Sequence, residues 1–239
     1  MSQALALQPP SPAAEQRIRH IIDAATTVMS RQGYASTSMK DIAREAGIAQ
    51  GLIHYYFGAK EDLVLAVLRE ACGEMLEASR RGFREATGDP LSRAWAALQA
   101  AEQRSVERPE LFRLMLEMVP LSISNPAFGA QLQELYRNLC DETMEMVDGL
   151  NELMPTPLPI STRDFAGVIV AAIDGLALRS LVDPQADLGA LFRAFGFMLL
   201  SVGATSYAKA DLPMPPLDQM LELLGGGTTA VAIEPQPRA

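Results

Sequence analysis

Residues 33–63, GYASTSMKDIAREAGIAQGLIHYYFGAKEDL, decide the fold, because they encode two short helices joined through a glycine. Residues 38–45 predict a helix with Thr37 as its N-cap, since a threonine side chain can accept a hydrogen bond from the first helical turn. Gly47 can adopt the left-handed conformation that is needed directly after a helix. A further helix is predicted from about residue 49 to 57. Two short helices in this order are a helix-turn-helix candidate.

The second helix of this pair has two chemically different faces. Apolar positions such as Ile53 suit an inner face, and polar positions between them suit an outer one. A glutamine can read adenine through a bidentate contact, an imidazole can meet a base edge, and a glycine lets the backbone approach closely. For His54 the alternative is to cap a neighbouring carbonyl group, and for the run Tyr55–Phe57 it is core packing. The residues predicted to face outward are Gln50, Gly51, His54 and Tyr55.

Helices are also predicted on both sides of this motif. From residue 15 to 31 apolar residues recur at three- and four-residue spacing, and Gly33 ends that helix. A long helix is predicted to start near Ala59, where Lys60 stands at the positive end of the helix dipole. That placement suits an external anion, and a surface lysine is the alternative.

Charge is distributed unevenly along the chain. The whole chain carries a formal net charge of -9, but the basic and acidic residues of positions 1–70 cancel. The negative charge therefore follows the helix-turn-helix, and the N-terminal part can still face phosphate.

The rest of the chain predicts helices only, because each apolar-periodic run follows a capping residue at 89, 125, 161 or 187. Apolar residues make up 49% and charged residues 21%, as in a globular protein. We therefore expect an all-α fold with two domains. The expected parts are a disordered arm at 1–14, a helix-turn-helix domain at 15–60, a ligand-binding and dimerisation domain at 61–224, and a disordered tail at 225–239.

Several classes of protein are disfavoured by the sequence. The two cysteines lie far apart, so we expect no disulfide framework, metal site or cofactor, and a reducing cytoplasm fits best. No stretch reaches the roughly 18 unbroken apolar residues of a membrane span, since 165–173 ends at acids on both sides. An enzyme is disfavoured because there are only two histidines, no glycine-rich phosphate loop and no nucleophile motif. We expect no catalytic residues.

The ordered pattern in residues 33–63 resembles the TetR-type bacterial transcriptional regulators. It consists of Gly, a Thr/Ser pair, Ile-Ala, Ala-Gly, a glycine, an aromatic run ending in Phe, and Lys-Glu-x-Leu. The resemblance implies that the second short helix enters the DNA major groove while the first crosses the backbone. Where many relatives have Tyr this chain has His54, and Ala59 stands where a capping residue is usual. By resemblance, the contacts to phosphate are expected from Thr37, Tyr55, Tyr56 and Lys60, and Ser38 is expected to belong to the same DNA-binding surface.

A weaker resemblance in residues 171–184 and 186–195 implies the dimerisation helices of the same family. Small residues there permit close helix approach, and an internal helix pair is the alternative. A two-fold dimer would present two recognition helices to half-sites about 34 Å apart, so we expect a palindromic double-stranded operator. Asp174 is expected to be a paired polar group in this run. The expected interface residues are Ala171, Asp174, Gly175, Leu178, Phe195 and Met198.

The middle helices carry methionines and aromatic residues that could line a cavity for a small hydrophobic or amphipathic ligand. Core packing is the alternative for each of them. Glu117 is the only acid in its apolar run and could recognise a cationic or hydroxylated ligand. The expected lining residues are Trp95, Phe112, Met115, Glu117, Met118 and Tyr136. Together these features predict a repressor released by a ligand; an activator or a helical binding protein with a purely structural helix-turn-helix are the alternatives.

Overall fold

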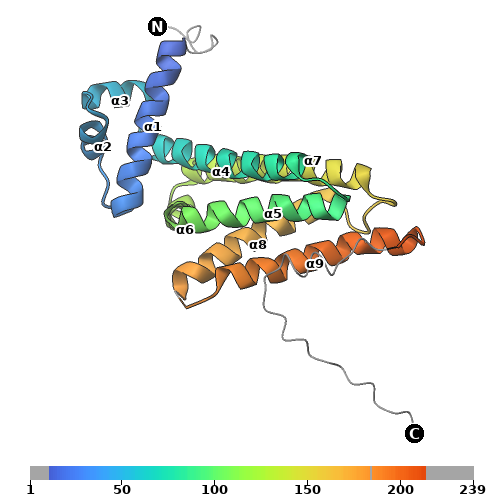
Figure 1. Ribbon diagram of the computed structural model, residues 1–239. Helices are drawn as coiled ribbons and strands as arrows, with labels where there is room; N and C mark the ends of the chain where they lie inside the picture. The colour runs from blue at the N-terminus through green and yellow to red at the C-terminus, as the bar shows by residue number, and fades with distance from the viewer. Residues whose placement is uncertain (1–10, 184, 214–239) are drawn as a thin grey trace.

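The computed structural model describes residues 11–183 and 185–213, and this part of the chain is entirely helical (Figure 1). The expected all-α class is therefore confirmed. The helices in the described ranges are α1 Pro12–Gln32, α2 Met39–Ala46, α3 Gln50–Tyr56, α4 Lys60–Glu85, α5 Pro90–Glu107, α6 Pro109–Ser124, α7 Pro126–Leu153, α8 Thr162–Val182 and α9 Leu188–Lys209. The expected tail at 225–239 lies outside the described residues.

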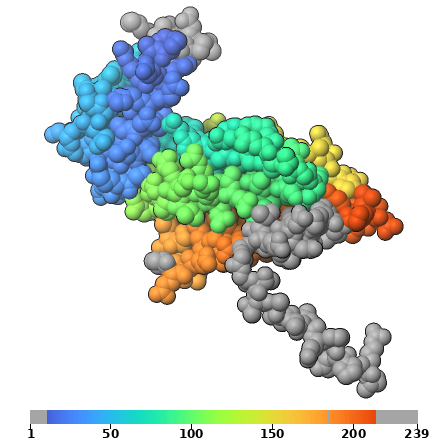
Figure 2. All heavy atoms as spheres, in the orientation of Figure 1, coloured from blue at the N-terminus to red at the C-terminus, as the bar shows by residue number. Residues whose placement is uncertain are grey.

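Helices α1 to α3 form a small unit at one end of α4 (Figure 1). Its core joins one fully buried aliphatic residue from each helix with the start of α4: Ile21, Ile42, Ile53 and Leu63 are each 0% exposed. Burying such side chains stabilises by roughly 1.5 to 3 kcal/mol each. The unit protrudes from the rest of the molecule in the space-filling view (Figure 2), which leaves its far side accessible.

Two helix starts differ from the sequence prediction. Helix α1 begins at Pro12 and not at residue 15, because the Ser11 side chain accepts a hydrogen bond from the Ala14 N–H and a proline fits the first turn. Helix α2 is capped by Ser38 and not by Thr37. Thr37 is 3% exposed and donates its hydroxyl to the Gly33 carbonyl oxygen at 2.7 Å, so it is not available as a cap.

The remaining helices form the larger body, in which α4 packs along α5 and α7 packs along α8. In Figure 1, α4, α5 and α7 form one side of this body and α8 and α9 the other. Trp95 of α5 and Phe192 of α9 lie in the second hydrophobic core. Helices α5 and α9 approach closely because Gly196 has no side chain: a Cβ there would overlap the Trp95 ring and come within 2.7 Å of Leu98 Cδ2.

Candidate nucleic-acid interface and ligand cavity

Residues close together in the sequence determine where α2 begins and where it ends before α3. Ser38 accepts from the Asp41 N–H while Asp41 accepts from the Ser38 N–H, a reciprocal pair that fixes the start of α2. The Ser38 hydroxyl also donates to the Asp41 carboxylate, and this hydrogen bond, together with the one from the Ser38 N–H, holds the pKa of Asp41 below its usual range. Gly47 ends α2 at φ 63°, the left-handed region that glycine adopts without strain. The predicted helix-turn-helix geometry is present.

Helix α3 presents one polar face to solvent. Gln50, Gly51, His54 and Tyr55 are all exposed, Tyr55 at 74%, whereas Ile53 is fully buried. The Gln50 amide and the His54 ring lie one turn apart, with 3.3 Å between Gln50 Nε2 and His54 Nε2. His54 therefore faces solvent and makes no hydrogen bond to a backbone carbonyl in the described residues. Figure 1 shows α3 on the side of the unit away from α4 to α9.

Tyr55 and Tyr56 divide between the two sides of this helix. Their rings meet edge to face with 5.0 Å between centroids. Tyr56 is half-buried and packs against the core of the unit, while Tyr55 points outward. Tyr55 therefore exposes more of its side chain to solvent than Tyr56 does.

Lys60 at the start of α4 faces inward to the α1–α2 connection. Its ammonium donates to the carbonyl oxygens of Tyr34 and Thr37, each at 2.9 Å, and lies 4.0 Å from the centroid of the Tyr34 ring. Burial raises the pKa of Tyr34, with the carboxylate of Glu61 adding to the shift. Lys60 thus stabilises the α1–α2 connection through hydrogen bonds to its backbone. The Thr37 side chain is buried, so its hydroxyl is not exposed for a contact with phosphate.

Two neighbouring cavities lie in the larger body. The deep cavity lies among α4, α5, α7, α8 and α9, measures about 1100 Å³ including its open mouth, and is lined by residues such as Trp95, Phe165 and Leu200. The outer cavity lies among α4, α5 and α6, with one lining residue each from α7 and α8, measures about 560 Å³ including its open mouth and is lined by Phe112 and Met115 among others. The mainly apolar side chains that line both cavities suit small organic ligands.

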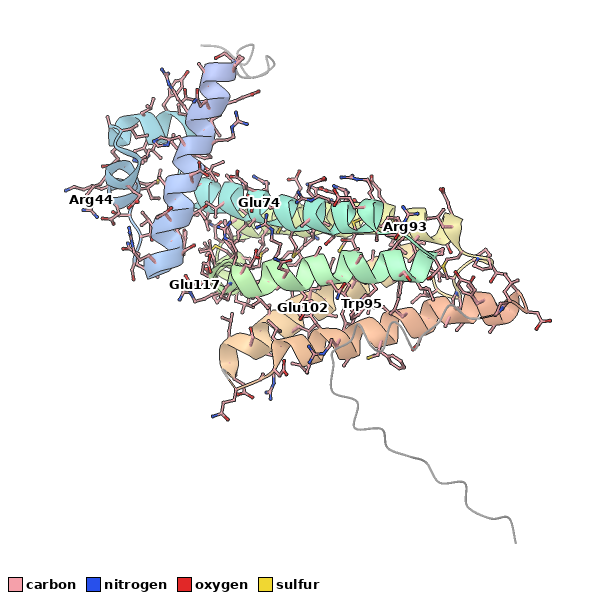
Figure 3. The ribbon with its side chains drawn as sticks, viewed as in Figure 1. Arg44, Glu74, Arg93, Trp95, Glu102 and Glu117 are labelled. Carbon is pink, nitrogen blue, oxygen red and sulfur yellow. The ribbon has the colours of Figure 1, made fainter. Side chains whose placement is uncertain are left out.

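Three of the expected ligand residues do not line either cavity. Met118 is 0% exposed in the core that joins α1 to α4 and α6, and the half-buried Tyr136 packs against the same core. Glu117 points to the helix-turn-helix unit: its carboxylate accepts from the Tyr34 N–H at 2.8 Å and lies next to Gly33. Figure 3 shows Glu117 near the base of α1. Glu117 therefore lies outside the lining of both cavities, because α6 turns this residue toward α1.

The expected interface residues fall on both sides of α8 and α9. Asp174 is half-buried and lines both cavities, and Phe195 is 9% exposed in the second core, so both side chains are directed into the larger body. Leu178 is 44% exposed and Met198 66% exposed, and Ala171 and Gly175 are also exposed.

The exposed side of α8 and α9 carries further apolar residues that the sequence prediction did not include. We call this surface the α8/α9 face; it comprises Val168, Ala171, Gly175, Leu178 and Val182 of α8 and Phe197 and Met198 of α9. Both helices are long and apolar enough to cross a membrane by length and composition alone, with mean hydropathies of 1.9 and 1.5, but only 22% and 33% of these segments is buried. Such an apolar surface is typical of an interaction site.

Cavity residues on α8 and α9 were also missed from the sequence. Phe165, Ile169 and Leu199 line the deep cavity. Because both helices are apolar on nearly all sides, their sequence shows no single buried stripe that could have separated cavity, core and interface positions.

Comparisons with known proteins agree with this geometry. A family described as bacterial regulatory proteins, tetR family, matches residues 21–67, and one described as BetI-type transcriptional repressor, C-terminal, matches residues 90–195. The regulator AcrR of Shigella flexneri is 29% identical over 194 residues, covering 79% of this chain and 90% of that protein. BetI of Rhizobium meliloti is 32% identical over 163 residues, covering 68% and 77%. The solved structure of the fatty acid degradation regulator FadR from Bacillus halodurans is similar with a TM-score of 0.64 at 25% identity, covering 76% of this chain and 97% of that one.

Proposed function

This chain belongs to the TetR family of bacterial DNA-binding transcriptional regulators, which are not enzymes, and we propose that it is a cytoplasmic homodimeric repressor that a small molecule releases from a palindromic operator. The observation that carries the proposal is the exposed polar face of α3. Gln50, His54 and Tyr55 face outward on a helix whose Ile53 is fully buried, so the face is held rigidly by the core of the unit. This is the arrangement that a recognition helix needs.

The residues of this surface divide into two roles. Gln50 and His54 lie one turn apart and are suited to base edges, with Gly51 allowing close approach. Ser38 and Tyr55 are also exposed and are suited to phosphate oxygens. Arg44 on α2 points away from the larger body (Figure 3) and forms an ion pair with Asp41 at 2.7 Å.

The α8/α9 face supplies the dimer in this proposal. Its exposed apolar side chains would be removed from water by a second copy, and a two-fold arrangement would place two α3 helices on half-sites roughly 34 Å apart. Leu178→Asp should give a monomer by light scattering and weaken operator binding. Val106→Asp is a matched control, because Val106 is 55% exposed on α5 and lies outside this face. A dimer that survives Leu178→Asp would contradict this interface.

Two helices that line the outer cavity, α4 and α6, also form hydrogen bonds to the α1–α2 connection. These contacts support coupling between ligand binding in the cavity and DNA binding by the helix-turn-helix. From α4, Lys60 donates to the carbonyl oxygens of Tyr34 and Thr37. From α6, Glu117 accepts from the N–H of the same Tyr34, and Arg113 donates to the Ser30 carbonyl oxygen at 2.8 Å.

A ligand that binds between α4 and α6 would therefore displace Lys60 and Glu117, which both hydrogen-bond to the backbone of the α1–α2 connection. We expect the fourth helix to shift and the separation of the two α3 helices to change, so that both half-sites are no longer met together. The effects of ligand and operator on each other's affinity must be equal. Equal operator affinity with and without every bound ligand would remove this mechanism.

The first experiment is selection from a randomised duplex pool followed by sequencing. A palindrome should emerge, and His54→Ala should relax the preference at particular bases at a cost of about 1 to 3 kcal/mol. Arg137→Ala, an exposed change on α7, is the control and should leave the selected site unchanged. If no sequence is enriched at moderate salt, the helix-turn-helix is structural and the chain works through its cavity. Reporter expression with and without the protein distinguishes a repressor from an activator.

A further inference from the structure

The two cavities meet at one acidic residue. Met75, Leu139 and Asp174 line both of them, so the deep and the outer cavity share this wall. A single elongated molecule could therefore extend from the deep cavity past Asp174 toward α6. Asp174 is the only ionisable side chain that lines the deep cavity in the described part of the chain.

Asp174 has no cationic partner. No arginine, lysine or histidine in the described ranges lies within ion-pair distance of its carboxylate, and its neighbours are the Tyr136 hydroxyl and the Cys72 thiol. Burial raises the pKa of Asp174, although the nearby Tyr136 hydroxyl opposes that shift. Buried carboxylates in proteins normally have a cationic or hydrogen-bonding partner, so a carboxylate without a cation in this cavity is unusual.

The positive charges near the outer cavity are, by contrast, already compensated. Arg108 lies 3.4 Å from Glu74 and 3.4 Å from Glu110, and Arg104 lies 3.6 Å from Glu107. Glu74 itself lines the outer cavity beside both arginines. The charge that lacks a partner in the combined cavity is therefore negative.

We propose that the ligand is a lipophilic cation, an amine or quaternary ammonium whose positive charge lies at Asp174 and whose apolar body fills the deep cavity. This inference rests on the proposed function, in which the cavity holds the effector. The aromatic side chains of Phe83, Trp95 and Phe165 line the same cavity and suit an apolar body with a nearby cation. Asp174 then gains the partner that the protein itself does not supply.

The single tryptophan of the chain gives a direct assay, because Trp95 lines the deep cavity. Figure 3 shows Trp95 on α5 facing α9. Its fluorescence can be titrated in DNA-free protein with three probes of equal chain length: octyltrimethylammonium, octanol and octanoate. We expect the ammonium to bind at least about tenfold more tightly than the other two.

Variants separate the charge from the shape of the cavity. Asp174→Asn keeps the side-chain volume and should abolish the preference for the ammonium, while octanol binding stays within about threefold. Asp141→Asn makes the same charge change at an exposed position on α7 and should retain the preference. If Asp174→Asn fails to fold, Tyr136→Phe tests the same site: it removes the hydroxyl near the carboxylate, and the protein should then bind the ammonium at least as tightly.

The outcomes that overturn the inference are specific. Tightest binding of octanoate would point to Arg104 and Arg108 and to an anionic amphipath, and equal binding of all three probes would make the site purely apolar. Because the titration contains no DNA, its result is independent of operator binding. A cation that binds at Asp174 without changing operator affinity would leave the ligand class standing and remove the release mechanism.

Discussion

Lys60→Met is the change that separates a structural from a DNA-contacting role at the start of α4. Methionine keeps the apolar stem and removes the ammonium, which donates to two carbonyl oxygens at 2.9 Å and lies over the Tyr34 ring. Each hydrogen bond contributes about 1 kcal/mol when water can replace it, and the cation–ring contact contributes about 0.5 to 1 kcal/mol. The expected loss is about 2 to 3 kcal/mol.

The assay measures stability and DNA binding on the same variant. A loss of this size lowers the Tm of a chain of this length by roughly 5 to 10 °C. If Lys60 makes no phosphate contact, the slope of log affinity against log salt concentration stays unchanged. Lys40→Met is the control: Lys40 is exposed on α2 in no ion pair of the described residues, so its Tm should stay the same.

The opposite result is equally clear. An unchanged Tm together with a salt slope smaller by about 0.9 would show that Lys60 binds a phosphate and that its contacts to the α1–α2 connection contribute little. In that case Lys60→Met would also lower the affinity for every DNA sequence by the same factor, because phosphate contacts carry no sequence preference.

Three further predictions follow from the larger body. Gly196→Ala should destabilise by about 1 to 3 kcal/mol and shift the fluorescence of Trp95, because its Cβ would overlap that ring; an unchanged spectrum and Tm would contradict the close approach. Burial raises the pKa of Cys72 to about 12, so its alkylation at pH 8 should be at least about a hundredfold slower in native than in unfolded protein, measured by peptide mass spectrometry. The raised pKa of Asp174 means that the folded state binds its proton more tightly than the unfolded state, so stability falls as the pH rises from the unfolded pKa, about 3.9, through the folded one. Asp174→Asn removes that loss, so its Tm relative to wild type should rise between pH 4 and pH 8; a constant difference would show that the group does not titrate in this way.

The sequence by itself determined the helix-turn-helix, because the signals that specify it are local. Gly47 provides the left-handed residue after α2, and the spacing around Ile53 sets the buried and exposed faces of α3. The same locality explains the error at the start of α2, where Thr37 and Ser38 are both capping residues. Only the hydrogen bond from Thr37 to Gly33 in the folded unit decides between them.

The tertiary structure alone decided the roles of Glu117, Asp174 and Phe195. Glu117 reaches the backbone of Tyr34, which is 83 residues away in the chain, and no local pattern encodes such a contact. Helices α8 and α9 are apolar on most of their surface, so whether a residue faces the cavity, the core or the outside depends on which helices pack against each side. Periodicity identifies a buried face only where polar residues mark the other one, and these two helices lack that contrast.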